Sequence, residues 1–523
     1  MNDQLAKTVI QHALDAGVRE FCIAAGKRNA PLVFLLSKIR DIKIYYWPEE
    51  RSAGYFALGR IRATRRPVVV ITTSGTAVGN LLPAAMEAYY TQLPILLLTA
   101  DRPRRQRGTG APQCAEQVGI FSHYVDFAQD IALEEECQLA DWNLQGPAHL
   151  NVCFEEPEED KLSQDFSFSM DQPAFIKTKT TSKNRSELEN FIHNVKNPVV
   201  VVGALNIEDR ENVARFLSLL KAPIYAEAIS GIREDPRLTD LRICSDQLFK
   251  NAAQANYPID GVLRIGSIPT CRIWRDLEEL AGKIRVCSIS HLPFSGLSWN
   301  GGIYDSLKDF FSDISYLPIE KKYACEKWLT HEKKLIANLK EIYQEEPQAE
   351  ISLIHYLSKL IPETSLVYLG NSLPIREWDQ AATWQQKNLK VEASRGLCGI
   401  DGQIATFLGL CTPEQQNWAI IGDLTALYDL VAPWIYPQLA PMDINLVIIN
   451  NGGGQIFSRM FSNPAFLNLH DVTFQPLAEL WKWHYEKWET IPTQLQSRKG
   501  ARLIEIQPND EATKRALQKI RKL

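Results

Sequence analysis

Two short apolar runs in the C-terminal third constrain the fold of this chain most strongly. Residues 418–421 (WAII) stop at Gly422-Asp423, and residues 444–449 (INLVII) stop at the string NNGGG; a helix-like stretch separates them. Apolar strands joined by a helix predict a βαβ unit in a parallel sheet. In such sheets, ligands bind just beyond the carboxyl ends of the strands.

Both predicted strand ends carry oxygen ligands and glycine. Asp423 offers a carboxylate, Asn451 offers an amide oxygen, and the glycines let the backbone approach a ligand closely. These groups suit a hard cation, such as a magnesium ion that holds a phosphate group. Asp and Asn also cap helices in ordinary βα turns, so this stretch by itself leaves both interpretations open.

Alternating strands and helices run through all 523 residues. This pattern predicts an α/β protein with three doubly wound parallel-sheet domains, at residues 1–175, 186–335 and 348–523. A polar linker is expected near residues 158–186, and the first and third domains look related. Strands are predicted at residues 20–24, 42–47, 67–72, 95–99, 146–154, 223–226, 261–266, 284–288, 365–369, 389–392, 418–421, 444–449 and 502–506, with a further strand starting at residue 197.

Composition narrows the class of protein. The net charge of −5 gives no electrostatic case for binding nucleic acid, and no apolar run is long enough to cross a bilayer. The first 18 residues have the pattern of an amphipathic helix rather than a signal peptide. The ten cysteines form no CxxC pair and lie mostly in apolar runs, which indicates buried thiols in a reducing cytoplasm.

A glutamate and several arginines are candidate functional residues at predicted strand ends. Glu50 follows a strand and opens a helix, so it is either a first-turn acid that interacts with the helix dipole or a buried carboxylate for proton transfer. Arg28, Arg102, Arg376 and Arg395 also lie at strand ends. Converging arginines predict a substrate with more than one carboxylate, although each one alone could be a solvated surface charge.

Other local patterns are less specific. The string SGT at residues 74–76 follows a strand and could approach a phosphate or a carbonyl, but it lacks the lysine of a P-loop. Arg104, Arg105 and Arg107 make a neighbouring loop basic, which could also be plain surface charge. The nine histidines lack metal-type spacing, no Ser/His/Asp or Cys/His arrangement stands out, and no GxGxxG string supports a nucleotide-binding dehydrogenase.

Taken together, these strings resemble the thiamine-diphosphate enzymes and, within them, the 2-succinyl-5-enolpyruvyl-6-hydroxy-3-cyclohexene-1-carboxylate (SEPHCHC) synthase family. The matching strings are GKRNAPL, EERSAGYFALG, TTSGTAVGNLLPAAMEA, LTADRP, GNSLPIR, SRGLCGIDG, GDLTALYDL and NNGGGQIF. The resemblance implies a transferase of menaquinone biosynthesis. Such an enzyme decarboxylates 2-oxoglutarate on thiamine diphosphate and adds the resulting carbanion to isochorismate in a 1,4-addition.

The resemblance also implies roles for individual residues. Glu50 would contact the aminopyrimidine N1′ of the cofactor, and Ile400 would wedge the cofactor into its bent shape. Asp423, Asn451 and Gly453 would hold magnesium, with manganese as an alternative ion; Asn451 is chosen over Asn450 by aligning from the glycines. The complete implied set for the cofactor is Glu50, Ser74, Gly75, Thr76, Ile400, Gly422, Asp423, Leu424, Asn451, Gly453, Gln455, Ile456 and Phe457.

The implied substrate residues divide into two groups. Ser372, Arg376 and Arg395 would bind 2-oxoglutarate. The implied residues for isochorismate are Lys27, Arg28, Arg102, Gln113 and Arg272. Lys27, Pro112 and Arg272 replace the serine, asparagine and lysine usual in the family, and IAAGK replaces CPGS. All four departures fall on the acceptor side, and because Lys27 and Arg272 keep positive charge, we expect an anionic acceptor.

Two alternatives stay open from the sequence. The chain could be a thiamine-diphosphate decarboxylase or carboligase with another acceptor, or a non-catalytic relative that binds an effector. The presence of Glu50, Asp423 and Asn451 argues against the second. The family resemblance further implies a homodimer or homotetramer with active sites between chains, and the cysteine pattern predicts that it is cytoplasmic.

Overall fold

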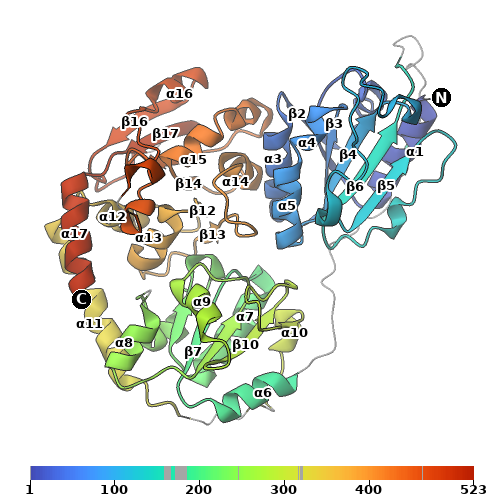
Figure 1. Ribbon diagram of the computed structural model, residues 1–523. Helices are drawn as coiled ribbons and strands as arrows, with labels where there is room; N and C mark the ends of the chain where they lie inside the picture. The colour runs from blue at the N-terminus through green and yellow to red at the C-terminus, as the bar shows by residue number, and fades with distance from the viewer. Residues whose placement is uncertain are drawn as a thin grey trace. The chain divides into compact units, whose positions relative to one another are not determined.

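Three parallel β-sheets organise the chain. The computed structural model describes residues 2–157, 167–170, 185–245, 247–315, 317, 322–461, 463–496 and 498–523. All the strand pairs within the three sheets are parallel, as Figure 1 allows the reader to follow. Parallel strands need crossover connections, and helices supply most of them. The predicted α/β class with three sheets is therefore confirmed.

The N-terminal sheet has the strand order β2-β1-β3-β4-β6-β5. Its inner strands are buried at every residue, which explains their continuous apolar sequences. The strands are β1 (Glu20–Ala24), β2 (Lys43–Trp47), β3 (Val68–Thr72), β4 (Ile95–Asp101), β5 (Phe127–Ile131) and β6 (Ala148–Cys153). The helices are α1 (Asn2–Asp15), α2 (Ala30–Leu36), α3 (Glu50–Thr64), α4 (Thr76–Gly79) and α5 (Leu82–Thr91).

The central sheet has the order β11-β10-β9-β7-β8. Its strands are β7 (Pro198–Val202), β8 (Ile224–Ala226), β9 (Gly261–Ile265), β10 (Arg285–Ser290) and β11 (Ile303–Tyr304). Its helices are α6 (Arg185–Asn194), α7 (Ile207–Leu220), α8 (Leu248–Gln254), α9 (Arg272–Asp276) and α10 (Leu307–Phe310).

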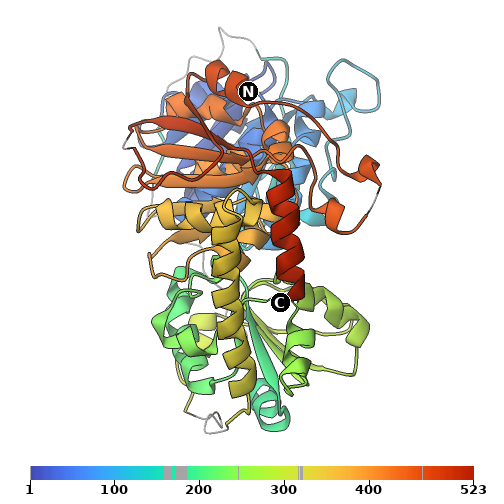
Figure 2. The same ribbon diagram turned by 90° about the vertical axis from the view of Figure 1, so that its left-hand side faces the viewer.

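The C-terminal sheet has the order β13-β12-β14-β15-β17-β16. Its strands are β12 (Leu366–Leu369), β13 (Lys390–Glu392), β14 (Asn417–Gly422), β15 (Ile444–Ile449), β16 (His484–Trp488) and β17 (Ala501–Ile506). The helices of this part of the chain are α11 (Glu326–Glu345), α12 (Glu350–Leu360), α13 (Leu373–Ala381), α14 (Gln403–Leu410), α15 (Asp423–Tyr428), α16 (Gln475–Leu480) and α17 (Asp510–Lys522). Figure 2 shows α17 beside the long helix α11, and Lys519 at its end forms an ion pair with Glu345 at 2.8 Å.

The first and third sheets share one topology. Numbered along the chain within each sheet, the strands follow the order second, first, third, fourth, sixth, fifth in both. The similarity expected between the N-terminal and C-terminal parts of the chain is therefore also seen in the strand order of their sheets. In each sheet, the carboxyl ends of the first, third and fourth strands are neighbours, and this is where the candidate residues lie.

The chain forms two compact units. The first contains residues 1–177, 394–412 and 425–441, and the second contains residues 178–393, 413–424 and 442–523. The proposed domain boundaries at residues 175, 186, 335 and 348 remain predictions. Most of the predicted linker at residues 158–186 lies outside the described residues. None of the helices in the described parts of the chain has the length and apolar character needed to span a membrane.

Helices α3 and α14 cross with almost no space between their backbones. A Cβ atom added at Gly59 would lie 2.1 Å from the backbone oxygen of Thr406, and one at Gly409 would lie 2.3 Å from that of Phe56. Glycine at both positions is what lets the two helices approach so closely. This contact holds residues 394–412 within the first unit, although they come from the C-terminal third of the sequence.

Candidate active site

The second unit brings three predicted strand ends together. Strands β12, β14 and β15 are adjacent, and Gly422 at the end of β14 pairs with Ile449 at the end of β15. The chain leaves these strands toward Ser372, Asp423 and Asn451, so the predicted βαβ unit and its polar strand ends are observed. Any ligand at this edge would meet all three segments.

Asp423 is the first residue of α15, directly after β14, and its carboxylate is buried. It accepts hydrogen bonds from the backbone N–H groups of Leu424 at 2.6 Å and Gly453 at 2.9 Å. Burial raises its pKa. The Nε2 atom of His470 lies 3.3 Å from Asp423 Oδ2, and its Nδ1 accepts a hydrogen bond from the Val472 N–H. A neutral His470 therefore carries its proton on Nε2, facing Asp423.

The two consecutive asparagines have different surroundings. The Asn450 side chain donates to the Val472 carbonyl at 2.8 Å and to Glu505 at 2.7 Å. The Asn451 Nδ2 donates to both carboxylate oxygens of Glu350, each at 3.0 Å. The Asn451 Oδ1 is buried and has no hydrogen-bond partner. An unpaired buried amide oxygen costs stability, and a bound cation would satisfy it, so this atom is a candidate metal ligand.

The glycines of the loop after β15 are required by its shape. Gly453 has a φ of 139°, and a Cβ atom there would lie 2.4 Å from the Leu467 carbonyl oxygen. Together with Asp423 at the start of α15, this loop offers a carboxylate, an amide oxygen and a backbone carbonyl. All are oxygens, which magnesium and manganese prefer over soft ligands, so the residues present fit such an ion.

Asn451 contacts a buried acidic network through Glu350. Glu350 begins α12, and Glu377 on α13 pairs with Arg459 at 2.8 Å. Burial, followed by the charge of Glu377, raises the pKa of Glu350. Sequence reasoning missed Glu350, Glu377, Arg459 and His470, because none lies within the quoted strings and only the fold brings them to this edge.

The remaining predicted residues of the second unit lie on the helix starts and loops around this edge. Ser372 precedes α13 with a φ of 74°, and the exposed Arg376 donates to the Ser372 carbonyl at 2.6 Å. Gln455 donates to the Asn451 carbonyl at 3.3 Å, and Ile456 leads into a short 3-10 helix that starts at Phe457. The exposed Phe457 ring stacks against Phe461 and also contacts Phe466.

Arg272, in the central sheet's part of the unit, opens the short helix α9. Its exposed side chain pairs with Asp276 at 3.1 Å. The buried Glu227 carboxylate accepts a hydrogen bond from the Cys271 N–H at 3.2 Å and so fixes the start of this helix.

The first unit gathers the other candidates at the carboxyl edge of its own sheet. Strands β2, β1, β3 and β4 are neighbours, so the segments that follow them share this edge. They carry Glu50, Arg28, Ser74 and Arg102, in that order across the sheet. The segments that carry these four residues therefore follow adjacent strands at one edge of the first unit's sheet.

Glu50 is not the residue that caps α3. The Glu49 side chain caps this helix, accepting hydrogen bonds from the Arg51 and Ser52 N–H groups at 2.8 Å each. Glu50 instead accepts a hydrogen bond from the Asn80 side chain at 3.1 Å. The capping function is thus filled by its neighbour, and the Glu50 carboxylate is left available for other contacts.

The SGT loop is built around Gly75, which has a φ of 84° and precedes α4. Its N–H donates to the buried Gln117 side chain at 2.9 Å, and the backbone of Gln113 packs against it. The Ser74 hydroxyl is buried without a hydrogen-bond partner, while Thr76 is exposed. Gln117 was not predicted; only the fold brings it from a distant loop to this turn.

Two of the predicted acceptor-side cations, Lys27 and Arg28, already have partners. Arg28 is buried and donates to the Phe154 carbonyl at 3.0 Å and to Glu156 at 2.6 Å, and the exposed Lys27 pairs with the same Glu156 at 2.5 Å. The Arg102 Nε is buried without a hydrogen-bond partner. An anionic substrate at this edge would therefore compete with Glu156 for Lys27 and Arg28.

The neighbouring basic loop is neutralised by acids. Arg104 pairs with Glu135 at 2.5 Å, and Arg105 pairs with Glu155 at 2.5 Å. Arg107 contacts Asp101, Asp130 and Cys153, three groups whose ligand atoms lie within 4.8 Å of one another. Because the guanidinium already occupies this cluster, its acids are satisfied by an internal ion pair, and the plain-charge interpretation of the basic loop is supported.

Arg395 and Ile400 lie in the segment before α14. The buried Glu87 accepts hydrogen bonds from the Gly396 and Leu397 N–H groups at 2.8 Å. Burial raises the pKa of Glu87, and these hydrogen bonds and the charge of Arg395 offset part of the rise. The Tyr55 hydroxyl donates to Asp401 at 2.6 Å, next to the half-buried Ile400. Helix α3 and helix α5 thus hold the turn that carries both predicted residues.

Comparison with known proteins identifies the class. Residues 4–120 match the family model described as the N-terminal TPP binding domain of thiamine pyrophosphate enzymes. The three α/β sheets described above agree with this class, so the chain is a thiamine-diphosphate enzyme.

Whole-length relatives identify the family. The chain is 43% identical over 516 residues to the SEPHCHC synthase of Bdellovibrio bacteriovorus, covering 98% of this chain and 97% of that protein. It is 32% identical to the SEPHCHC synthase of Akkermansia muciniphila, and the match covers 97% of this chain and 96% of that protein. It is 29% identical to the SEPHCHC synthase of Bacillus pumilus, and the match covers 94% of this chain and 91% of that protein. The chain belongs to the SEPHCHC synthase family.

Proposed function

We propose that this protein catalyses the SEPHCHC synthase reaction of menaquinone biosynthesis. In this transfer, 2-oxoglutarate loses its C1 carboxylate as carbon dioxide, and the remaining four-carbon unit forms a carbon–carbon bond with isochorismate by 1,4-addition. The observation that carries the proposal is the 43% identity to the Bdellovibrio synthase over 98% of the chain. When bound, thiamine diphosphate supplies the electron sink for this chemistry.

The proposed cofactor residues divide between the two units. Glu50 holds the proton at the aminopyrimidine N1′, a role supported by the capping of α3 by Glu49 instead. Ser74, Gly75, Thr76 and Ile400 line the organic part of the cofactor.

We assign the diphosphate and its metal ion to the start of α15, directly after β14, and to the loop after β15. Asp423, Asn451 and the Gly453 carbonyl hold magnesium or manganese, and the buried, unpaired Asn451 Oδ1 supports this assignment. The remaining diphosphate-side residues are Gly422, Leu424, Gln455, Ile456 and Phe457.

The proposed substrate residues supply positive charge for carboxylates. Ser372, Arg376 and Arg395 bind 2-oxoglutarate. The isochorismate set is Lys27, Arg28, Arg102, Gln113 and Arg272. The pairing of Lys27 and Arg28 with Glu156 supports an anionic acceptor that exchanges for this carboxylate.

We further propose a homodimer or homotetramer in the cytoplasm. Exposed aromatic rings at Phe457, Phe461 and Phe466, directly after the proposed metal loop, support burial against another chain. Nine of the ten free cysteines are buried or half-buried, which supports a reducing compartment. The oligomeric state can be measured by light scattering of the holoenzyme, and a monomer would contradict this part of the proposal.

One assay tests the function. The purified protein is incubated with thiamine diphosphate, magnesium, 2-oxoglutarate and isochorismate, and the products are analysed by mass spectrometry. We expect the adduct together with carbon dioxide. Carbon dioxide without the adduct would mean another acceptor, consistent with the departures at Lys27, Pro112 and Arg272. Failure to bind thiamine diphosphate in calorimetry would instead indicate a non-catalytic relative.

A further inference from the structure

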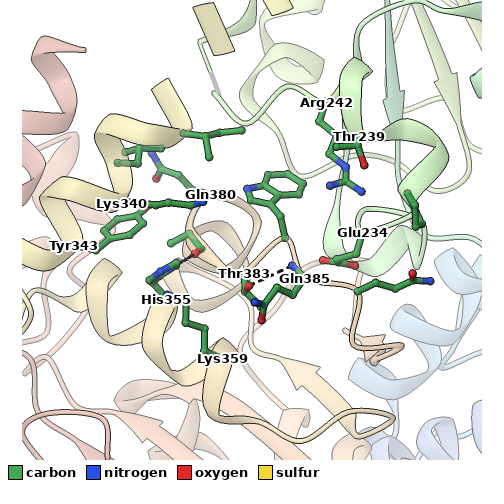
Figure 3. Close-up of a pocket in the computed structure, with 17 residues that line it drawn as sticks. Glu234, Thr239, Arg242, Lys340, Tyr343, His355, Lys359, Gln380, Thr383 and Gln385 are labelled. Carbon is green, nitrogen blue, oxygen red and sulfur yellow. Dashed lines mark hydrogen bonds between the residues drawn. The ribbon is translucent and has the colours of Figure 1, made fainter. Parts of the chain in front are cut away.

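A pocket of about 500 Å³ lies in the second unit, away from the loops after β14 and β15. It is lined by the segment around a 3-10 helix at Pro236–Leu241, by α11, by α12 and by the connection that follows α13. Figure 3 shows side chains from all these elements around one cavity. Its volume falls within the range of small-molecule sites.

Three cations surround this pocket. Arg242 follows the 3-10 helix, Lys340 lies on α11 and Lys359 lies on α12. In Figure 3, Arg242 and Lys340 point toward the middle of the pocket from opposite sides. Among the described residues, none of the three has a carboxylate within 4.0 Å. The one acid in the lining, Glu234, is already paired with Arg233 at 2.7 Å.

Burial and neighbouring cations act on both Lys359 and Arg242. Burial, and then the charge of Lys340, lower the pKa of Lys359. Burial, and then the charge of Arg233, lower the pKa of Arg242, and the charges of Glu234, Asp235 and Asp240 offset part of this effect. His355 in the pocket wall accordingly has its pKa lowered to about 4, chiefly by burial and further by the two lysines. At neutral pH the pocket therefore holds an excess of positive charge, which an anion would relieve.

The inner wall offers hydrogen-bond donors and a flat apolar surface. The Arg242 Nε and the Tyr343 hydroxyl are both buried without hydrogen-bond partners. The guanidinium groups of Arg233 and Arg242 lie over the Trp384 ring, with their Cζ atoms 3.6 Å and 5.3 Å from its centroid. The ring therefore orients both cations. Apolar residues Leu339, Ala381 and Ala382 complete the lining.

We propose that this pocket is a binding site for a small organic anion with at least two carboxylate or phosphate groups. One anionic group lies between Arg242 and Lys340, a second lies toward Lys359, and the body of the molecule packs over Trp384. Charge-assisted hydrogen bonds to an arginine fork favour carboxylate and phosphate alike. The proposal does not depend on the reaction assigned above.

Calorimetry on the holoenzyme, saturated with thiamine diphosphate and magnesium, tests this site with two probes. Phthalate presents two carboxylates on a flat ring, and fructose 1,6-bisphosphate presents two phosphates. We expect at least one probe to bind once per chain with a Kd below about 1 mM, and to bind more weakly as salt is added. The probe that binds more tightly identifies the preferred anionic group.

Variants locate the binding. Lys340→Gln changes an exposed side chain and should fold normally; it and Arg242→Gln should each weaken the tighter probe by about tenfold. Lys334→Gln, an exposed lysine on the same helix outside the lining, is the matched control and should bind like the wild type. The proposal is overturned if neither probe binds below about 1 mM, or if the two pocket variants bind as tightly as the control.

Discussion

The Glu350 carboxylate receives both of its side-chain hydrogen bonds from the same atom, the Asn451 Nδ2, at 3.0 Å each. This contact fixes the orientation of the Asn451 amide, because only its nitrogen can donate to a carboxylate. The Oδ1 atom must then point away from Glu350, and it is left buried without a partner. Glu350 is therefore a positioning residue for the proposed metal ligand.

Removing Glu350 should weaken metal binding. With Glu350→Ala, the Asn451 amide loses its orientation, and we expect the magnesium concentration for half-maximal activity to rise by about tenfold or more. Glu350→Gln keeps an acceptor oxygen and should lie between this variant and the wild type. A magnesium titration of activity at saturating thiamine diphosphate measures the change.

The matched control for Glu350 is Glu341→Ala, which removes an exposed acid from α11. It should leave the magnesium titration unchanged. If Glu350→Ala gave the same titration as this control, Glu350 would have no part in holding Asn451.

Glu50→Gln should stop cofactor activation without unfolding the protein. The amide cannot hold the proton at the aminopyrimidine N1′, so we expect exchange of the thiazolium C2 proton to slow by about two orders of magnitude or more. The exchange is measured by NMR in deuterated water. Glu49→Gln, which changes the neighbouring cap, should lower the melting temperature while leaving exchange in the folded enzyme close to normal. Wild-type exchange in Glu50→Gln would remove Glu50 from its assigned role.

The crossing of α3 and α14 predicts a strong packing effect. Gly59→Ala places a methyl group against the Thr406 carbonyl and should cost about 2 kcal/mol of unfolding free energy or more. Gly79→Ala is the control, because a Cβ atom there meets nothing within 4 Å. That substitution should be neutral or slightly stabilising. Chemical denaturation of the three proteins compares them, and equal losses for both variants would contradict the close crossing.

A buried histidine predicts acid sensitivity of the N-terminal sheet. His149 contacts the Thr99 hydroxyl at 2.8 Å and packs edge-on to Phe121, and burial lowers its pKa from 6.5 to about 4. The unfolded state therefore binds this proton first. Above about pH 6.5, His149 is neutral in both states and costs the folded protein no stability. As the pH falls from about 6.5 to about 4, the unfolding free energy decreases by about 3 kcal/mol.

His149→Gln tests this assignment because glutamine does not titrate. As the pH is lowered from 7 to about 4.5, the unfolding free energy of the wild type should fall more than that of the variant. A difference that stays constant over this range would mean that His149 has the same pKa in the folded and unfolded states.

The sequence predicted the sheets well where strands are buried on both faces. The run INLVII at residues 444–449 is buried at every residue and was recognised from its continuous apolar character. The strands β5 (FAQDI) and β16 (HYEKW) were missed. Both lie at sheet edges and are mostly only half-buried, so their polar sequences do not reveal them.

The candidate residues follow the same division. Asp423 and Asn451 were found because they directly follow strong strands. Glu350 and His470 have no such signal, since they act on these residues from elements 101 and 47 positions away in the chain (451 − 350 and 470 − 423). The identical strand order of the two outer sheets was only suggested by their similar style, because strand order depends on contacts that no local pattern encodes.

The fate of labelled 2-oxoglutarate tests the central claim most directly. With uniformly ¹³C-labelled 2-oxoglutarate, unlabelled isochorismate, thiamine diphosphate and magnesium, the proposed reaction predicts one labelled carbon dioxide for each molecule of an adduct that contains four labelled carbons. Glu50→Gln should form neither product at a measurable rate. Labelled carbon dioxide without a four-carbon-labelled adduct, or no thiamine-dependent release at all, would contradict the proposed function.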